Sequence, residues 1–430
     1  MKIDTILVGM TMMLLLALPA AASDYTLGIF GNANEDDTIN MQDVTYTELI
    51  ILEYRDQTEL ADAKYDDKIN MQDVTQIELI ILGKEKEMTL IDQADRIVTV
   101  PRPIERIITG LPDPARLVIA FGEGDKLVGL STYGKFCLCY KGPEVAPMCA
   151  AGVCGGRLFE LPDVGEYYIT NLELTVALKP DVIFSAGFSG EVDDVVQEKT
   201  GIPVVSIKSG GHKFEEMYEA AELMGAVLKR EDEVQELISL VEEKIDKVRD
   251  VTSEIPDDEK PTVYFAARGV DPDTYGGSIT RTTNFYEPLN IAGGINVATD
   301  CGAASYGEVD VSKEQILLWN PDIIIVSPHG LGKSFDDVGV ILSDPDLQTV
   351  DAVKNHRVYF SVYPYCCGTP PDRNLANMMY LAKLFHPEEF ADLDVEEEGN
   401  EIYEGFLRVD GLFSEYADTT VWLREWLDAQ

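Results

Sequence analysis

The sequence contains few of the residues and motifs that enzymes commonly use. Histidine occurs only four times in 430 residues, and no two histidines are spaced as a catalytic or metal-binding pair. The segment from His329 to Ser334 ends like a phosphate-binding loop, but Ser327 stands where the first glycine of that loop belongs. A nucleophile elbow and a dinucleotide-binding glycine motif are also missing. We therefore expect no enzymatic activity; the alternative is an exported redox or metal-cluster protein.

Basic side chains are scarce as well. The chain has 34 Lys and Arg against 77 Asp and Glu, which gives a formal net charge of −43. A protein this acidic repels phosphate, so we expect it to bind neither nucleic acid nor anionic lipid. Two interpretations of the charge stay open, namely a surface adapted to salt and a surface that attracts a charged partner.

A long apolar run is present only at the N-terminus. It extends from Ile6 to Leu18, follows the single cation Lys2, and leads to Pro19 and three alanines at 20–22. This pattern predicts a signal peptide over residues 1–22 and therefore a secreted or cell-surface, extracytoplasmic protein. An uncleaved anchor helix is the alternative, although the apolar core is short for a membrane span.

One pattern occurs twice in the chain. Glu173 precedes the Pro180-Asp181 pair, and Glu314, which lies 141 residues later (314 − 173), precedes Pro321-Asp322 at the same spacing. Each copy is typical of a short helix that begins with an acid, followed by a buried strand. Because 430 residues hold two or three domains, the repeat predicts two equivalent α/β lobes with a cleft between them.

The order of predicted strands and helices after residue 90 divides the chain into an N-terminal lobe over 90–208, an interlobe helix over 209–255 and a C-terminal lobe with a helical extension over 256–430. Strands alternate with helices in both lobes, which predicts Rossmann-like lobes with parallel sheets and ligands beyond the strand C-termini. An apolar stripe from Phe214 to about Val251 predicts one long helix of about 50 Å that joins the lobes.

A second, tighter repeat fills residues 24–88. The segment from Ile39 to Thr45 recurs letter for letter from Ile69 to Thr75. Each copy follows a loop with oxygen-bearing side chains at alternate positions, a pattern that suits Ca²⁺. The candidate ligand positions are Asn32, Asn34, Asp36, Thr38, Asn40 and Asp43 in the first loop, and Asp62, Asp66, Lys68, Asn70 and Asp73 in the second.

This pair of loops and helices resembles the type I dockerin module, a small all-α domain that binds Ca²⁺ and docks onto a cohesin. Lys64 stands at the third loop position, where a cation cannot coordinate Ca²⁺, so the second site is expected to be weak or empty. The resemblance implies a cohesin-like partner, and hence a scaffold component of the cell surface as an alternative function. A Ca²⁺-stiffened spacer without a partner stays open.

The two Pro-Asp strand entries, the run from Ala292 to Val297 and the interlobe helix make residues 90 to 390 resemble a class III substrate-binding protein. Such proteins deliver iron-siderophores, haem or cobalamin to ABC importers. The resemblance implies a shallow cleft with little closure, and it implies that Glu173 and Glu314 contact arginines of the membrane permease. We expect a metal-containing solute, with an iron chelate favoured over corrinoid, haem, free metal or cluster.

All seven cysteines fall in loops predicted to border the cleft. They either form disulfides or supply soft ligands for a thiophilic metal or an iron–sulfur species. Arginines in these loops can hold carboxylates of an anionic chelate, and tyrosines can ligate iron or stack on a macrocycle. The candidate cleft residues are Tyr133, Cys137, Cys139, Cys149, Cys154, Arg268, Tyr275, Arg281, Cys301, Tyr363, Tyr365, Cys366, Cys367 and Arg373.

Overall fold

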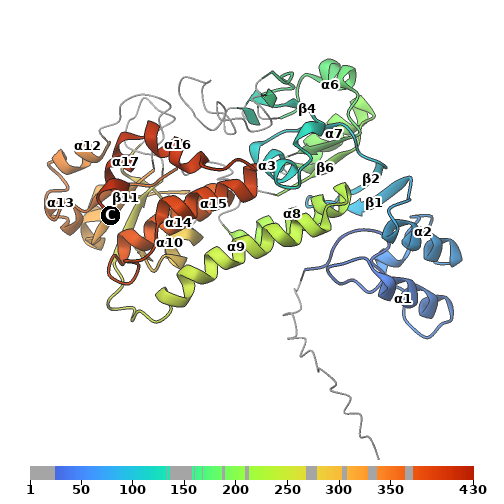
Figure 1. Cartoon of the computed structure of the whole chain (residues 1–430), viewed down its shortest axis with the longest axis horizontal. Coiled ribbons are helices and arrows are strands. Elements are labelled where there is room, and N and C mark those ends of the chain that lie inside the picture. The colour runs from blue at the N-terminus through green and yellow to red at the C-terminus, as the bar shows by residue number, and fades with distance from the viewer. Residues whose placement is uncertain are drawn as a thin grey trace, which may run out of the picture.

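The computed structural model describes residues 25–132, 134–135, 157–158, 160–166, 168–185, 189–208, 213–267, 278–302, 308–327, 337–363 and 371–430. It places two α/β lobes at opposite ends of a helical middle layer, with the N-terminal module beyond the first lobe (Figure 1). The two sheets remain separate, which confirms the prediction of two lobes.

The N-terminal lobe is built on a four-stranded parallel sheet in the order β4-β3-β5-β6. Its buried strands carry Ile and Val on both faces, as expected for a sheet covered by helices on both sides. Its strands are β3 (Ile107–Thr109), β4 (Leu127–Leu130), β5 (Val182–Ser185) and β6 (Val204–Ser206), and its helices are η2 (Gly124–Lys126), α3 (Pro112–Ala120), α6 (Leu172–Leu178) and α7 (Gly190–Thr200).

The C-terminal lobe has a mixed sheet in the order β10-β8-β7-β11-β12, with β9 paired to β7. Strands β7, β11, β12 and β9 run parallel, whereas β8 is antiparallel to both β7 and β10, so the fully parallel sheet that was predicted is wrong at this edge. The strands are β7 (Thr262–Ala266), β8 (Arg281–Thr283), β9 (Ile295–Asn296), β10 (Glu308–Asp310), β11 (Ile323–Val326) and β12 (Val358–Phe360). The helices are α10 (Glu287–Ile291), α11 (Lys313–Trp319), α12 (Asp337–Ser343), α13 (Asp351–Lys354) and α14 (Pro371–Phe385).

The Pro-Asp repeat has the same structural role in both lobes. The carboxylate of Asp181 accepts hydrogen bonds from the backbone N–H groups of Glu105 and Arg106, just before β3 (2.8 and 2.9 Å). Asp322 accepts in the same way from the backbone N–H of Thr262 at the start of β7 (2.9 Å). In each lobe the aspartate therefore fixes the beginning of the neighbouring central strand, which explains why the sequence repeats it.

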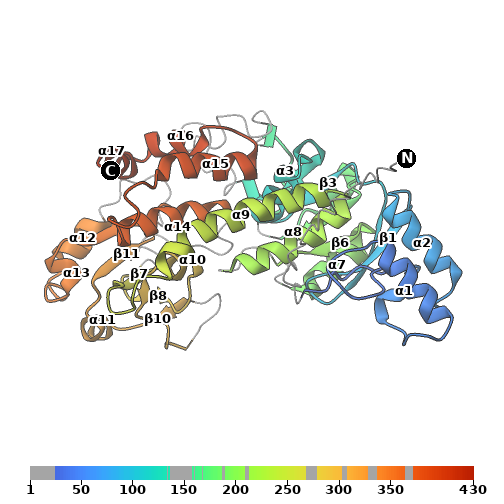
Figure 2. The ribbon, with the colours of Figure 1, turned by 60° about the horizontal axis from the view of Figure 1, so that its bottom comes forward.

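The predicted single interlobe helix is wrong, because the structure has two helices there, α8 (Phe214–Leu228) and α9 (Glu231–Thr252). Lys229 adopts the left-handed conformation (φ 58°) and ends α8 by donating its backbone N–H to the Gly225 carbonyl. The chain then reverses, so that α8 and α9 lie side by side (Figure 2) and Gly225 packs directly against Val234. Of these two helices, α9, about 33 Å long, is the one that joins the two lobes.

The N-terminal module contains two helices, α1 (Met41–Ile51) and α2 (Met71–Ile81), and the short η1 (Glu59–Ala61). It is followed by a hairpin of β1 (Glu87–Ile91) and β2 (Ile97–Pro101), so the boundary predicted between residues 88 and 90 falls inside β1. Ile29 also forms a bridge with Leu90 and belongs to the same hydrophobic core as the lobes. The module is therefore packed against the main body.

The C-terminal extension forms α15 (Val395–Leu407), α16 (Leu412–Thr419) and α17 (Val421–Asp428). It was predicted to pack on the second lobe, and α15 does contact α14, but it also contacts α3 of the first lobe (Figure 1). At its end, the Arg408 guanidinium donates to the backbone carbonyl of Ala120. A second helix besides α9 thus joins the lobes.

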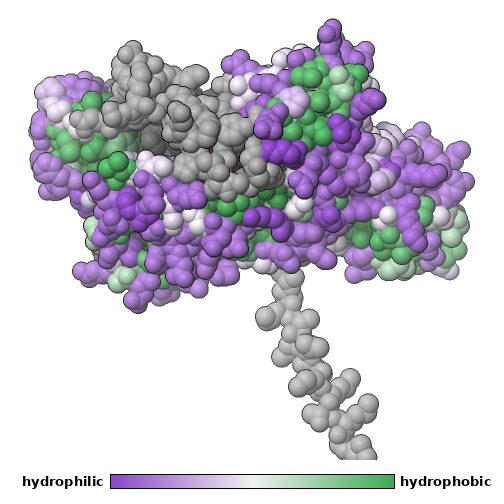
Figure 3. All heavy atoms as spheres, turned by 45° about the horizontal axis from the view of Figure 1, so that its top comes forward, coloured by the Kyte–Doolittle hydropathy of each residue, from purple (hydrophilic) through white to green (hydrophobic). Residues whose placement is uncertain are grey.

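On the face drawn in Figure 3, the described residues present a mainly hydrophilic surface with separate hydrophobic patches, one of them over the part of the N-terminal lobe that carries α6. Among the described residues, no helix is both long and apolar enough to cross a bilayer.

Candidate functional site

The strand C-termini of the two sheets lead into the segments where we expected a ligand. Of the candidate cleft residues, Arg281, Cys301, Tyr363 and Arg373 belong to the described part of the chain. The others lie outside the described residues: Tyr133, Cys137, Cys139, Cys149, Cys154, Arg268, Tyr275, Tyr365, Cys366 and Cys367. Their roles stay predictions.

Tyr363 and Arg373 come together after β12, at the start of α14. The Arg373 guanidinium carbon lies 5.2 Å from the centroid of the Tyr363 ring, in a cation–π arrangement. Tyr363 also stacks on Tyr416 of α16, with ring centroids 4.7 Å apart. Both side chains are buried, so they form part of the interior between the lobes.

The other two described candidates have different surroundings. Arg281 begins β8 and makes a two-pronged ion pair with Asp310 on the neighbouring strand, with its Nε and Nη2 at 3.0 and 3.2 Å from the two carboxylate oxygens. This pair gives Arg281 a structural partner across the antiparallel ladder. Cys301 is a half-buried free thiol.

The structure adds three charged residues that the sequence analysis missed, because they lie in helices that otherwise read as core. Arg116 on α3 donates its Nε to both carboxylate oxygens of Asp372 on α14, at 2.9 and 3.1 Å. Both side chains are fully buried, as is Asp113 one turn earlier on α3. One feature could have pointed to this cluster: α3 is buried at every position, yet it contains an aspartate and an arginine, which are rarely buried without a partner.

This cluster is electrostatically unusual. Burial raises the pKa of Asp113 to about 7, an effect that the positive charge of Arg116 opposes and the negative charge of Asp372 reinforces. Burial likewise raises the pKa of the phenols of Tyr363 and Tyr403, so both stay neutral. The region where the lobes meet therefore holds two arginines, a carboxylate and a second carboxyl that titrates near neutral pH.

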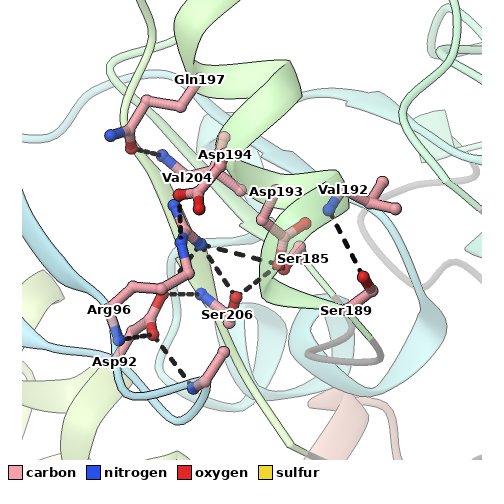
Figure 4. A network of polar contacts seen from close by, with 11 residues as sticks. Asp92, Arg96, Ser185, Ser189, Val192, Asp193, Asp194, Gln197, Val204 and Ser206 are labelled. Atoms are coloured by element: carbon pink, nitrogen blue, oxygen red, sulfur yellow. Dashed lines mark hydrogen bonds and ion pairs between the residues drawn. The ribbon is translucent and has the colours of Figure 1, made fainter.

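A second polar network lies at the C-terminal ends of β5 and β6 (Figure 4). The carboxylate of Asp193 on α7 accepts hydrogen bonds from the hydroxyls of Ser185 and Ser206. Arg96, in the β1–β2 turn, donates to the Ser206 hydroxyl and to Asp92, each at 3.0 Å. Burial raises the pKa of Asp193 despite these bonds. The network ties the hairpin to the strand ends and thereby fixes this border of the predicted cleft.

Glu173 and Glu314 occupy equivalent positions on α6 and α11 and are both exposed. Asn171 and Ser312 cap the two helices by accepting a backbone N–H three residues later, at 3.2 Å in each case. Hydrogen bonds from its own backbone N–H and the Ser312 hydroxyl lower the pKa of Glu314. Exposed apolar side chains accompany the acids, Val176 on α6 (47%) and Leu318 on α11 (78%). An exposed acid beside an apolar side chain is a composition that suits a protein interface.

Comparison with known proteins identifies the fold to which this arrangement belongs. Residues 107–361 match the family described as periplasmic binding protein. The chain belongs to this family. Its solved relatives include the molybdate-binding protein MolA of Haemophilus influenzae in complex with molybdate, whose structure superposes with a TM-score of 0.59 at 23% identity and covers 75% of this chain and 98% of that one.

Two sequence relatives of this periplasmic binding protein complete the comparison. It is 25% identical over 308 residues to an uncharacterized ABC transporter substrate-binding lipoprotein, YvrC, of Bacillus subtilis, covering 71% of this chain and 87% of the relative. It is 22% identical over 235 residues to a vitamin B12-binding protein of Vibrio parahaemolyticus, covering 53% and 73%. The relatives are solute-binding proteins, and the matched family region does not include the N-terminal module.

The two loops of the N-terminal module differ in how well they suit a cation. In the first, the Asn32 side-chain oxygen is buried and has no hydrogen-bond partner. In the second, the Lys64 ammonium donates to the Gln72 side chain at 2.9 Å, while the Asp62 carboxylate accepts the backbone N–H groups of Asp66 and Asp67. Within the described residues, no three His, Cys, Asp or Glu side chains gather as a metal site, so an ion in the first loop would need amide and carbonyl oxygens in addition to its carboxylates. The resemblance to dockerin and the cohesin-like partner stay predictions.

Proposed function

We propose that this periplasmic binding protein is the extracytoplasmic solute-binding subunit of an ABC importer, and that it delivers a metal-containing solute to a membrane permease. The observation that carries the proposal is the duplicated architecture: two lobes are each built on their own sheet, and each carries an exposed acid at the same position of an equivalent helix. A binding function suits this symmetry, because two such surfaces fix the orientation of a docked permease as well as adding affinity.

The mechanism needs little movement of the lobes. Both α9 and α15 contact elements on either side, and one hydrophobic core runs through the lobes and these helices. A solute held between the strand ends is therefore carried by a nearly rigid body, which docks through Glu173 and Glu314. Release follows from the ATP cycle of the transporter, and this chain makes or breaks no bond.

For the solute, we propose an iron chelate. The relatives are named for molybdate and vitamin B12, so corrinoid or haem binding is the alternative, as is an iron–sulfur or thiophilic metal species held by cleft cysteines. The candidate cleft arginines Arg268, Arg281 and Arg373 favour an anionic solute, because a guanidinium binds a carboxylate or oxyanion through two parallel hydrogen bonds.

The test of the solute class starts with protein purified without oxygen, whose absorbance spectrum, metal content and free thiols are measured. The protein is then titrated by calorimetry with a ferric catecholate, haem, cobalamin and molybdate. Saturable binding of the ferric chelate supports the proposal. Binding of cobalamin or haem alone would replace the iron chelate, and turnover of any added compound to a product would overturn the transport function itself.

We also propose that the first loop of the N-terminal module binds Ca²⁺ through Asn32, Asn34, Asp36, Asn40 and Asp43, together with the carbonyl of Thr38. Burial raises the pKa of Asp43 even though the backbone N–H groups of Asn34 and Asn40 donate to its carboxylate, and a bound cation would further compensate that buried charge. Such an ion would stiffen the loop ahead of α1, with a Kd on the order of 10⁻⁴–10⁻³ M. Calorimetric titration of the whole protein with CaCl₂ tests this, and the absence of heat at 10-fold above the upper Kd in that range would contradict it.

A further inference from the structure

The buried charged cluster joins the two lobes at one point. Arg116 belongs to the N-terminal lobe and Asp372 to the C-terminal lobe, and their ion pair has no exposed side-chain surface on either partner. Arg116 lies in the middle of α3, the helix that follows the central strand β3, and Asp372 lies at the beginning of α14. Any change in the relative position of the lobes must therefore stretch or break this pair.

The pairing of Arg116 is incomplete. Its Nε donates to Asp372, but neither Nη1 nor Nη2 has a hydrogen-bond partner, although both are buried. The two carboxylate oxygens of Asp113 are also buried and have no partner. Buried polar groups are almost always hydrogen-bonded, so unsatisfied donors and unsatisfied acceptors in one cluster indicate that a second arrangement exists.

Asp113 is the natural second partner for Arg116. The two residues are three positions apart on α3, a spacing at which side chains on a helix are neighbours. Asp113 and Asp372 therefore compete for one guanidinium, the first from within the N-terminal lobe and the second from across the interface. Which carboxylate binds the Arg116 guanidinium therefore depends on whether Asp113 is charged.

The surroundings of Asp113 contain further charged groups. Arg373 on α14 favours its ionised form and Asp372 opposes it. Tyr403, on α15 packed against α3, is a neutral phenol near both Asp372 and Arg373. On η2, which also packs on α3, Lys126 makes an ion pair with Glu123 at 3.0 Å. The glutamates of α8 interact with each other, with Asp37, and with Gln93 and Lys208. The partners that can respond to Asp113 directly are thus Arg116 and Arg373.

We propose that Arg116 is an interlobe latch with two positions: it binds Asp372 across the interface while Asp113 is protonated, and it turns toward Asp113 when that carboxyl ionises. Acidic conditions hold the lobes in a single arrangement, and alkaline conditions loosen them. Because burial places the pKa of Asp113 at about 7, the change falls within the range that an extracytoplasmic protein meets. The inference concerns the empty protein and does not depend on which solute it carries.

The test measures the distance between the lobes in the full mature protein without solute. A ketone-bearing amino acid replaces Val195 on α7 and Val340 on α12, both exposed, and is spin-labelled so that the native cysteines are left alone. Pulsed electron paramagnetic resonance then gives the distance distribution at pH 5.5 and 8.5. We expect a narrow distribution at pH 5.5 that is at least twice as wide at pH 8.5.

Two variants and a control decide the result. Asp113→Asn should stay narrow at both pH values, and Asp372→Asn, which removes the partner across the interface, should be wide at both. Glu222→Gln is the matched control, because it removes another carboxyl whose pKa burial raises to about 7, on α8 rather than in the Arg116 pair; it should behave like the wild type. A wild type whose width does not change with pH, or an Asp113→Asn variant that still changes, would overturn the latch.

Discussion

Replacing Asp113 with asparagine should make the stability of the protein less dependent on pH. The pKa of this buried carboxyl rises from 3.8 to about 7 on folding, and each pKa unit corresponds to 1.36 kcal/mol. The unfolded chain therefore loses this proton as pH rises from about 4, while the folded protein keeps it until about pH 7. Over that window, Asp113 lowers the free energy of unfolding by about 4 kcal/mol.

Urea unfolding of both proteins at pH 4.5, 5.5, 6.5 and 7.5 measures this contribution. Because one hydrophobic core runs through both lobes, we expect them to unfold together. The free energy of unfolding of Asp113→Asn minus that of the wild type should increase steadily with pH, by about 3 kcal/mol between pH 4.5 and 7.5. Other carboxyls with raised pKa values are present in both proteins and cancel in this difference. Parallel pH profiles would show that Asp113 is ionised in the folded state and would refute the reasoning.

Four further outcomes follow from the described contacts. Glu173→Ala and Glu314→Ala should each impair solute uptake by whole cells yet leave solute affinity unchanged. The control Glu191→Ala, at an exposed position of α7, should change neither uptake nor affinity. A loss of affinity in the first two variants would place these acids in the binding site instead. Gly225→Val should lower the free energy of unfolding by about 1–3 kcal/mol, because its side chain would meet Val234 where α8 and α9 touch; an unchanged urea midpoint would contradict this contact. Lys244→Met should lower the free energy of unfolding by about 3 kcal/mol, since it leaves the buried Glu398 with Lys247 as its remaining partner. The urea midpoint measures this loss as well. EGTA should lower the melting temperature only if the first loop holds Ca²⁺, which at 100-fold its Kd stabilises by about 2.7 kcal/mol.

The lobes could be predicted because their defining residues act locally. A Pro-Asp pair ends a short helix, and its aspartate caps the adjacent strand, so the same few letters produce the same turn in both lobes. Buried parallel strands also have an unmistakable composition, as in the Ile-Ile-Ile-Val of β11. The exposed positions of Glu173 and Glu314 follow from this repeated geometry.

Other features depend on contacts that no local pattern encodes. The apolar stripe continues across Lys229, so nothing in the periodicity marks the left-handed residue that separates α8 from α9. The packing of the N-terminal module against the main body could not be predicted for a similar reason, because Ile29 and Leu90 are distant in the sequence and pair only in the folded protein. Arg116 and Asp372 lie 256 positions apart in the chain, and only the meeting of the lobes shows that they form one cluster. The strand-end loops hold most of the remaining candidates, and their roles stay predictions.

The contact between α15 and α3 has a consequence for how the chain reaches its final state. Arg408 and Ala120, which it joins, are separated by 288 positions, so the first lobe stays incomplete until nearly the whole polypeptide has been synthesised. Closing so large a loop is slow compared with forming local contacts. Shortening the chain by its last helices would leave an apolar face of α3 uncovered, and we expect the shortened protein to aggregate while it folds, even if each sheet can assemble.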